Sequence, residues 1–267
     1  MSPSQPPLRR FVIVAAPRTG SNWLCTLLDS HPDILCHHEI FNPGGIHLAW
    51  SRRDGSLDLG SVAERDRDPE SVLKRVWSNG LGHARVGFKM TRGQAEGVLA
   101  AVLADRTVLK IVLRRADALA TFVSETLARQ TGEWESYPGL DVGRQRPRIE
   151  VDPDELATHR GTNSAFYEAI DRVLEASGQT AIHTLYERLG TVEEQRRLLA
   201  ALGVDPSPPL RGVTRKQTPT DLRRVVTNYD AVSGLAPAVE GRSQEQLPPE
   251  RATAPLATSN PAPRTEV

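Results

Sequence analysis

The chain has 267 residues, of which 39% are hydrophobic and 25% charged, enough for one large α/β domain or two small ones. Its 33 basic and 33 acidic side chains give a formal net charge of zero, which argues against a general nucleic-acid binder but leaves room for a local basic cleft. No apolar run approaches the ~20 residues that cross a bilayer. The run at residues 11–16 is also shorter than a signal-peptide core of about 7–15 residues, so we expect a cytoplasmic protein without an integral membrane segment.

The first apolar run, FVIVA at residues 11–15, is typical of a strand buried on both faces of a parallel sheet. Pro17 then ends the strand, Gly20 permits unusual backbone angles, and Ser21 is the expected cap of a helix whose apolar residues follow. A strand, a glycine turn and a helix start together direct backbone N–H groups at an anion. Arg18 adds a forked cation suited to phosphate or sulfate, although an ordinary turn with a surface Arg remains the alternative.

This loop differs from the nucleoside-triphosphate P-loop, G-x-x-x-x-G-K-[ST], at the positions that handle a metal-bound triphosphate. Ser21 stands where that motif has Lys, and Asn22 stands where it has the hydroxyl that binds Mg²⁺. The loop therefore predicts an anion site without a metal. A P-loop kinase or NTPase is disfavoured but stays open.

The rest of the chain alternates between strand and helix patterns. Further strands are expected at 34–36, 85–90, 108–113 and 180–187, and helices at 68–78, 94–103, 117–129, 152–177 (with possible breaks near Gly161) and 192–202. This order predicts an α/β fold: a single P-loop-like domain over residues 1–234, with a central parallel sheet of about five strands flanked by helices. Residues 51–68 and 132–150 are expected to be irregular, and residues 235–267 to form a Pro/Ala-rich tail.

The segment PRTGSNWL at residues 17–24 resembles the 5′-phosphosulfate loop of sulfotransferases that use PAPS (3′-phosphoadenosine-5′-phosphosulfate), commonly P-[KR]-[ST]-G-[ST]-[TN]-W-L. The resemblance implies that the loop residues bind the phosphosulfate: Arg18, Thr19, Gly20, Ser21 and Asn22. It also implies that Trp23 stacks on the adenine, although Trp23 could instead be a core residue of the first helix.

Two further segments resemble the 3′-phosphate site of this family. Arg115 and Ser124 lie nine apart across a strand-to-helix junction, a spacing similar to that of bacterial carbohydrate sulfotransferases acting on trehalose and Nod factors. Arg215 and Lys216 resemble the R-K-G loop that closes over the 3′-phosphate, but Gln217 replaces its Gly. The alternatives are a surface Arg with a solvent-facing Ser, and a solvated basic turn.

The catalytic residues follow from the same resemblance. The cytosolic enzymes use a His in a K-x-H segment, but here Lys89 is followed by Met and Thr. The trehalose-sulfating type instead has a Glu shortly after the second strand, which corresponds to Glu39. Glu39 is the expected base if burial raises its pKa toward neutrality, with Arg18 and Lys89 stabilising the developing charge. A strand-end acid paired with a cation is the alternative.

His37, His38, Glu39 and His47 show no regular zinc spacing, so no metal is expected. The resemblance covers roughly residues 11–230. It implies a sulfotransferase that moves a sulfuryl group from PAPS to a hydroxyl of a carbohydrate, glycolipid or similar small acceptor and releases PAP. Residues 41–67 and 132–150 are the expected acceptor-recognition segments. A noncatalytic anion-binding module remains possible, and the sequence leaves open the acceptor and the oligomeric state, a homodimer included.

Overall fold

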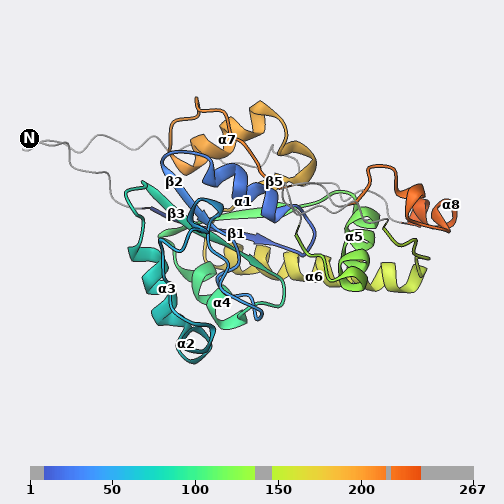
Figure 1. Cartoon of the computed structure of the whole chain (residues 1–267), viewed down its shortest axis with the longest axis horizontal. Helices are drawn as coiled ribbons and strands as arrows, with labels where there is room; N and C mark the ends of the chain where they lie inside the picture. The colour runs from blue at the N-terminus through green and yellow to red at the C-terminus, as the bar shows by residue number, and fades with distance from the viewer. Residues whose placement is uncertain (1–8, 136–145, 215–217, 236–267) are drawn as a thin grey trace, which may run out of the picture.

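The computed structural model describes residues 9–135, 146–214 and 218–235, which form a parallel sheet covered by helices on both faces (Figure 1). Its five strands run in the order β2-β3-β1-β4-β5. They are β1 (Arg9–Ala15), β2 (Ile34–His37), β3 (Arg85–Thr91), β4 (Val108–Arg114) and β5 (Ile182–Leu185). The predicted α/β fold with a parallel sheet of about five strands is confirmed. The predicted tail at 235–267 lies outside the described residues except for Leu235.

Strand β1 shows why the sheet is buried on both faces, because its side chains alternate between two cores. Phe11, Ile13 and Ala15 pack beneath α1 (Ser21–Asp29) and α7 (Val192–Leu202). Val12 and Val14 pack on the opposite face, which is covered by three helices (Figure 1). These are α3 (Pro69–Ser78), α4 (Glu96–Ala104) and α6 (Pro153–Ala176).

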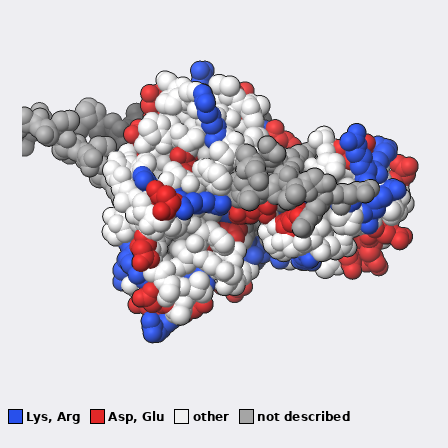
Figure 2. All heavy atoms as spheres, viewed as in Figure 1, with Lys and Arg blue, Asp and Glu red and all other residues white. Residues whose placement is uncertain are grey.

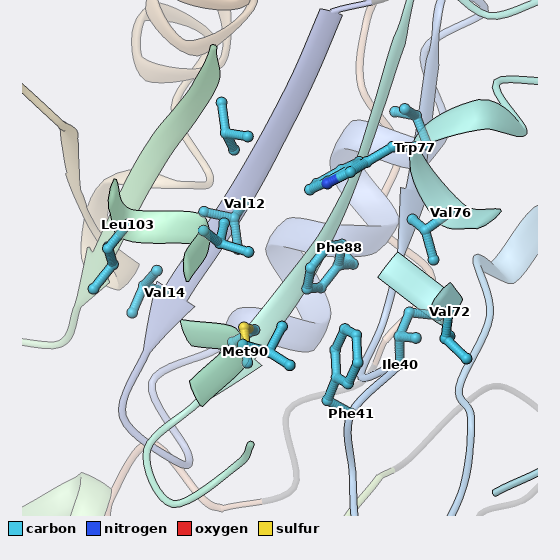
Figure 3. Packing of buried hydrophobic residues seen from close by; sticks show 14 of the residues in the cluster. Val12, Val14, Ile40, Phe41, Val72, Val76, Trp77, Phe88, Met90 and Leu103 are labelled. Atoms are coloured by element: carbon cyan, nitrogen blue, oxygen red, sulfur yellow. The ribbon is translucent and has the colours of Figure 1, made fainter. Parts of the chain in front are cut away.

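The second of these cores is rich in aromatic rings near the β2 edge of the sheet. Phe88 of β3 lies between Phe41 and Trp77, with ring centroids 5.6 Å and 5.1 Å away (Figure 3). Phe41 follows β2, so this packing fixes the chain immediately after Glu39. The position of the expected base is therefore determined by the core.

A third core joins α5 (Ala118–Thr131) to the start of α6 and to the last described segment, which contains α8 (Tyr229–Val232). Ile149 forms a parallel bridge with Val226 here. Within the described chain, no helix combines the length and the apolar character that a membrane crossing requires. Acidic and basic side chains are interspersed on the face shown in Figure 2.

Two sequence expectations about secondary structure are wrong. Residues 51–68 contain a helix, α2 (Val62–Arg67), which begins with a capping box between Ser61 and Glu64. Helix α6 continues through Gly161 without interruption. Its long packing surface against the sheet and α5 outweighs the helix cost of one glycine, about 1 kcal/mol.

Tyr167 of α6 connects this helix to the ends of two central strands. Its buried hydroxyl donates to the carbonyl of Leu113 at 2.7 Å and accepts from the backbone N–H of Ala16 at 2.8 Å. Burial raises the pKa of Tyr167 to about 12, so the hydroxyl stays protonated and makes both bonds. These bonds fix the end of β1, just before the loop at residues 17–24, which we call the anion loop.

Candidate active site

A cavity of about 770 Å³ lies at the carboxyl ends of the strands, where open α/β sheets bind their ligands. The segment that follows each of the five strands contributes to its wall. The contributing residues include Arg18 after β1, Glu39 after β2, Gln94 after β3, Arg115 after β4 and Tyr186 after β5. The topology thus gathers sequence-distant polar groups into one site.

The anion loop opens this cavity at the start of α1. Gly20, not Ser21 as expected, is the N-cap, and it adopts a left-handed conformation with φ of 87°. A Cβ at Gly20 would lie 2.2 Å from the Tyr186 ring, so both the backbone angle and the packing require glycine. No side chain caps α1. The first N–H groups of the helix have no intrahelical acceptor, and they are therefore available to an anion.

Arg18 lies beside this helix start and also has a positive φ, 63°. Its Nε donates to Ser124 Oγ at 2.9 Å, and its guanidinium also donates to the carbonyl of Trp134. Burial and the nearby Arg115 lower the pKa of Arg18 to about 10, which still leaves it charged at neutral pH. The Thr19 hydroxyl is buried and donates to the carbonyl of Ala16 at 2.8 Å, so this side chain shapes the loop.

Arg115 and Ser124, the expected 3′-phosphate ligands, both line the cavity. Arg115 donates to the carbonyl of Arg18 at 3.2 Å, and its guanidinium lies 4.6 Å from the centroid of the Tyr186 ring. Glu187 accepts from the backbone N–H groups at the start of α5, at 3.2 Å and 3.4 Å. Hydrogen bonds between side chains and backbone groups therefore hold together the segments that follow β1, β4 and β5.

Lys89 is the centre of a buried polar network. Its Nζ lies 2.8 Å from Glu39 Oε1, donates to the Asn22 side-chain carbonyl, and lies 3.4 Å from Ser21 Oγ. The Lys89 side chain is only 3% exposed. The expected charge stabiliser, the expected base and the anion loop are thus in direct contact.

The ion pair corrects one expectation about Glu39. Burial does act to raise the pKa of Glu39, but the charge of Lys89 and hydrogen bonds from Lys89 and Asn42 outweigh it and lower the pKa to about 2. A carboxylate with that pKa is ionised at neutral pH but weakly basic. The sequence could not show this, because the two partners are 50 positions apart, from 39 to 89.

The two histidines before Glu39 are buried and turn to different partners. The His37 ring accepts from the N–H of Ala49 at 3.1 Å, and His38 Nδ1 lies 3.2 Å from the Asn22 side-chain oxygen. Burial lowers the pKa of both, that of His37 to about 4, so both rings are neutral at neutral pH. Among the described residues, no three His, Cys, Asp or Glu side chains gather as metal ligands.

Trp23 lines the cavity and also contacts the core, with its ring edge-to-face to Tyr186 at 5.7 Å. Arg215 and Lys216, the expected loop over the 3′-phosphate, lie outside the described residues. Sequence reasoning assigned no site role to Tyr186 or Gln94, which also line the cavity. It included Trp134 and Glu135 only as members of the expected acceptor-recognition segment 132–150, and tertiary contacts bring these individual residues to the cavity wall.

No family model matches the chain, but comparison with known proteins finds several that are similar to it. Nodulation protein H of Rhizobium meliloti (strain 1021) is 26% identical over 241 residues, covering 86% of this chain and 92% of that protein. Nodulation protein H of Rhizobium tropici is 31% identical over 141 residues, 49% of this chain and 51% of its own length. A sulfotransferase structure from Alicyclobacillus acidocaldarius covers 88% of this chain and 92% of its own, with a TM-score of 0.47 and 18% identity. The chain is thus similar to nodulation protein H over most of its length, and the segments that resemble sulfotransferase motifs converge on one cavity.

Proposed function

We propose that this protein transfers the sulfuryl group of PAPS to a hydroxyl of a carbohydrate or glycolipid and releases PAP. The observation that carries the proposal is the convergence on one cavity of an uncapped helix start, two cations and a carboxylate: Arg18, Lys89 and Glu39. Sulfuryl transfer needs positive groups that bind the anionic donor, and it needs a base for the acceptor hydroxyl at the same place.

The donor fits the residues present. The uncapped N–H groups from Ser21 onward and the guanidinium of Arg18 supply donors for the phosphosulfate, while Arg115 and Ser124 supply a cation and a hydroxyl for the 3′-phosphate. Trp23 offers an aromatic face for adenine in the same cavity. Asn22 replaces the hydroxyl that binds Mg²⁺ in P-loop kinases, so we assign no metal to the reaction.

In the proposed reaction, the bond from sulfur to the bridging oxygen of PAP breaks as the acceptor oxygen bonds to sulfur. Lys89, Arg18 and the backbone N–H groups of the loop stabilise the charge that grows on the bridging oxygen. Glu39 takes the proton of the acceptor hydroxyl. All atoms are thereby accounted for, with PAP and the sulfate ester as products.

The ion pair suggests how Glu39 becomes basic enough for this step. While Lys89 is paired with Glu39, the pKa of the carboxyl is about 2. When Lys89 turns toward the negative charge of the donor, the remaining burial acts to raise that pKa. Donor binding therefore activates the base, and an empty donor site leaves it weak.

The acceptor assignment is supported by similarity to nodulation protein H and by the sequence resemblance to carbohydrate-sulfating enzymes. Within the two segments expected to recognise the acceptor, only Asn42, Pro43, Gly44, Trp134 and Glu135 of the described residues line the cavity. Asn42 donates to Glu39 at 2.5 Å, and Glu135 adds a carboxylate to the same cavity, so both can bind hydroxyl groups of an acceptor.

The proposal is tested in two steps. In a thermal-shift titration, PAP should stabilise the protein at lower concentration than ADP, and added Mg²⁺ should not change that order. Transfer of label from ³⁵S-PAPS to a panel of sugars and glycolipids should then identify an acceptor. Tighter binding of ADP, or release of phosphate from ATP, would favour the kinase alternative, and PAP binding without transfer to any hydroxyl would favour a noncatalytic module.

A further inference from the structure

A short segment, residues 133–135, lies against the anion loop just beyond the end of α5, and we call it the strap. The carbonyl of Trp134 accepts from the guanidinium of Arg18. Glu135 accepts from the Asn22 side-chain amide at 2.9 Å and pairs with Arg53 at 3.5 Å. The backbone of the strap is therefore fixed relative to the donor-binding loop, independently of the Trp134 side chain.

The Trp134 side chain is an unusual wall for this cavity. It lines the cavity, yet Trp134 is 47% exposed. The other large hydrophobic residues with comparable exposure in the described chain are aliphatic: Leu81, Val173, Val192 and Leu235. A tryptophan that keeps one face wet beside a functional cavity is typical of a binding surface, since it offers a large rigid area with few rotatable bonds.

The polar groups that line the same cavity restrict the ligand that would cover the indole. Asn42 and Glu135 line the same cavity and bring amide and carboxylate groups to it, and Glu39 lies within it. A flat, wholly apolar ligand would bury these polar groups without partners, which is unfavourable. A pyranose ring has a C–H face that packs on an indole and hydroxyls at its edge that satisfy polar neighbours.

We propose that Trp134 is the stacking platform of the acceptor subsite, where it binds the C–H face of a pyranose ring and directs a ring hydroxyl toward Glu39. The inference rests on the proposed function and adds to it the residue that selects sugars. Because Arg18 is bonded to the carbonyl of Trp134, the sugar platform and the donor loop keep a fixed separation.

The test compares Trp134→Ala and Trp134→Phe with Val192→Ala, which truncates an exposed apolar side chain at the start of α7 that does not line the cavity. Acceptors are an N-acetylglucosamine tetrasaccharide and trehalose, with 2-naphthol as a flat apolar alternative. Trp134→Ala should raise the KM for the sugar that is sulfated about tenfold or more, with the PAP dissociation constant within about twofold of wild type. Trp134→Phe should restore part of the loss, and Val192→Ala should change neither value.

Binding can be followed without turnover by titrating the same sugars into the PAP complex and recording tryptophan fluorescence. The change seen with the wild type should disappear in Trp134→Phe. An unchanged sugar KM in Trp134→Ala, an equal effect in Val192→Ala, or a preference for 2-naphthol would overturn the inference while leaving sulfuryl transfer intact. A wild-type protein that fails to bind PAP would instead overturn the proposed function, and this inference with it.

Discussion

Replacing Glu39 with Gln tests both the proposed base and the ion pair that holds it. Gln keeps the size of the side chain and an oxygen for the Asn42 amide, but it cannot take a proton and carries no charge. General-base catalysis contributes about 10²–10⁴-fold, so kcat should fall by about that factor. PAP should bind with near-native affinity, because the donor ligands remain in place. Glu96→Gln, which changes an exposed acid at the start of α4, is the matched control.

The same substitution has a calculable effect on stability. The pKa of Glu39 is about 2, against an ordinary value of 4.5. This difference corresponds to roughly 3 kcal/mol of unfolding free energy. Because the folded-state pKa is the lower one, the contribution is fully present well above pH 4.5 and is lost as the pH falls toward about 2. At about pH 3.5, roughly 1 kcal/mol of it is already lost.

Urea unfolding of the wild type and Glu39→Gln at about pH 6 and about pH 3.5 measures this effect. The stability difference between the two proteins should shrink by roughly 1 kcal/mol at the lower pH. In Lys89→Met the buried carboxyl loses its cation and its pKa rises above the ordinary value, so this variant should gain stability relative to the wild type on acidification. Equal differences at both pH values would refute the ion pair, and a retained kcat in Glu39→Gln would refute the base.

Four other outcomes follow from the site. Arg18→Ala should weaken PAP binding and lower turnover while the circular dichroism spectrum is unchanged; native affinity and rate would contradict its role. Arg115→Ala should reduce the preference for PAPS over adenosine 5′-phosphosulfate by tenfold or more, since a charged hydrogen bond contributes ~1.5–3 kcal/mol, and an intact preference would assign the 3′-phosphate to another cation. Gly20→Ala should destabilise the protein by about 2 kcal/mol or more, a fall in Tm of roughly 4–8 °C, because of its φ and the contact with Tyr186; an unchanged Tm would show that the ring can move. Sulfuryl transfer should persist in excess EDTA, and recovery of a lost rate on adding Mg²⁺ would contradict the metal-free site.

The sheet was predictable because its signals are local. Each strand is an apolar run bounded by turn residues, as at residues 11–15. Such runs are typical of strands that are buried on both faces of a parallel sheet. Helix α2 was missed because it is polar and lacks an apolar stripe, although the capping box formed by Ser61 and Glu64 was readable. The N-cap of α1 is Gly20 and not the expected Ser21, because the loop needs a residue in the left-handed conformation at that point.

The site was predictable only where short motifs name its residues. The loop at 17–24 and the pair Arg115 and Ser124 do meet at one cavity. The pKa of Glu39 was not predictable, since it depends on the ion pair that Glu39 forms with Lys89 of β3 in the folded chain. Trp134 lay within the segment 132–150 expected to recognise the acceptor, but it could not be singled out there, because its exposure and the hydrogen bond to its carbonyl exist only once the chain has folded.

The hydroxyl of Tyr167 has a consequence for the order in which the protein folds. Ala16 and Tyr167 are 151 positions apart, yet their hydrogen bond holds the residue immediately before the anion loop. Contacts of such separation form slowly, because a long loop must close before they do. We therefore expect the sheet to assemble first and the anion loop to reach its final shape only when α6 docks. A nascent chain whose α6 is not yet synthesised would contain the whole loop sequence. It would lack the hydrogen bonds of Tyr167 that complete the anion site.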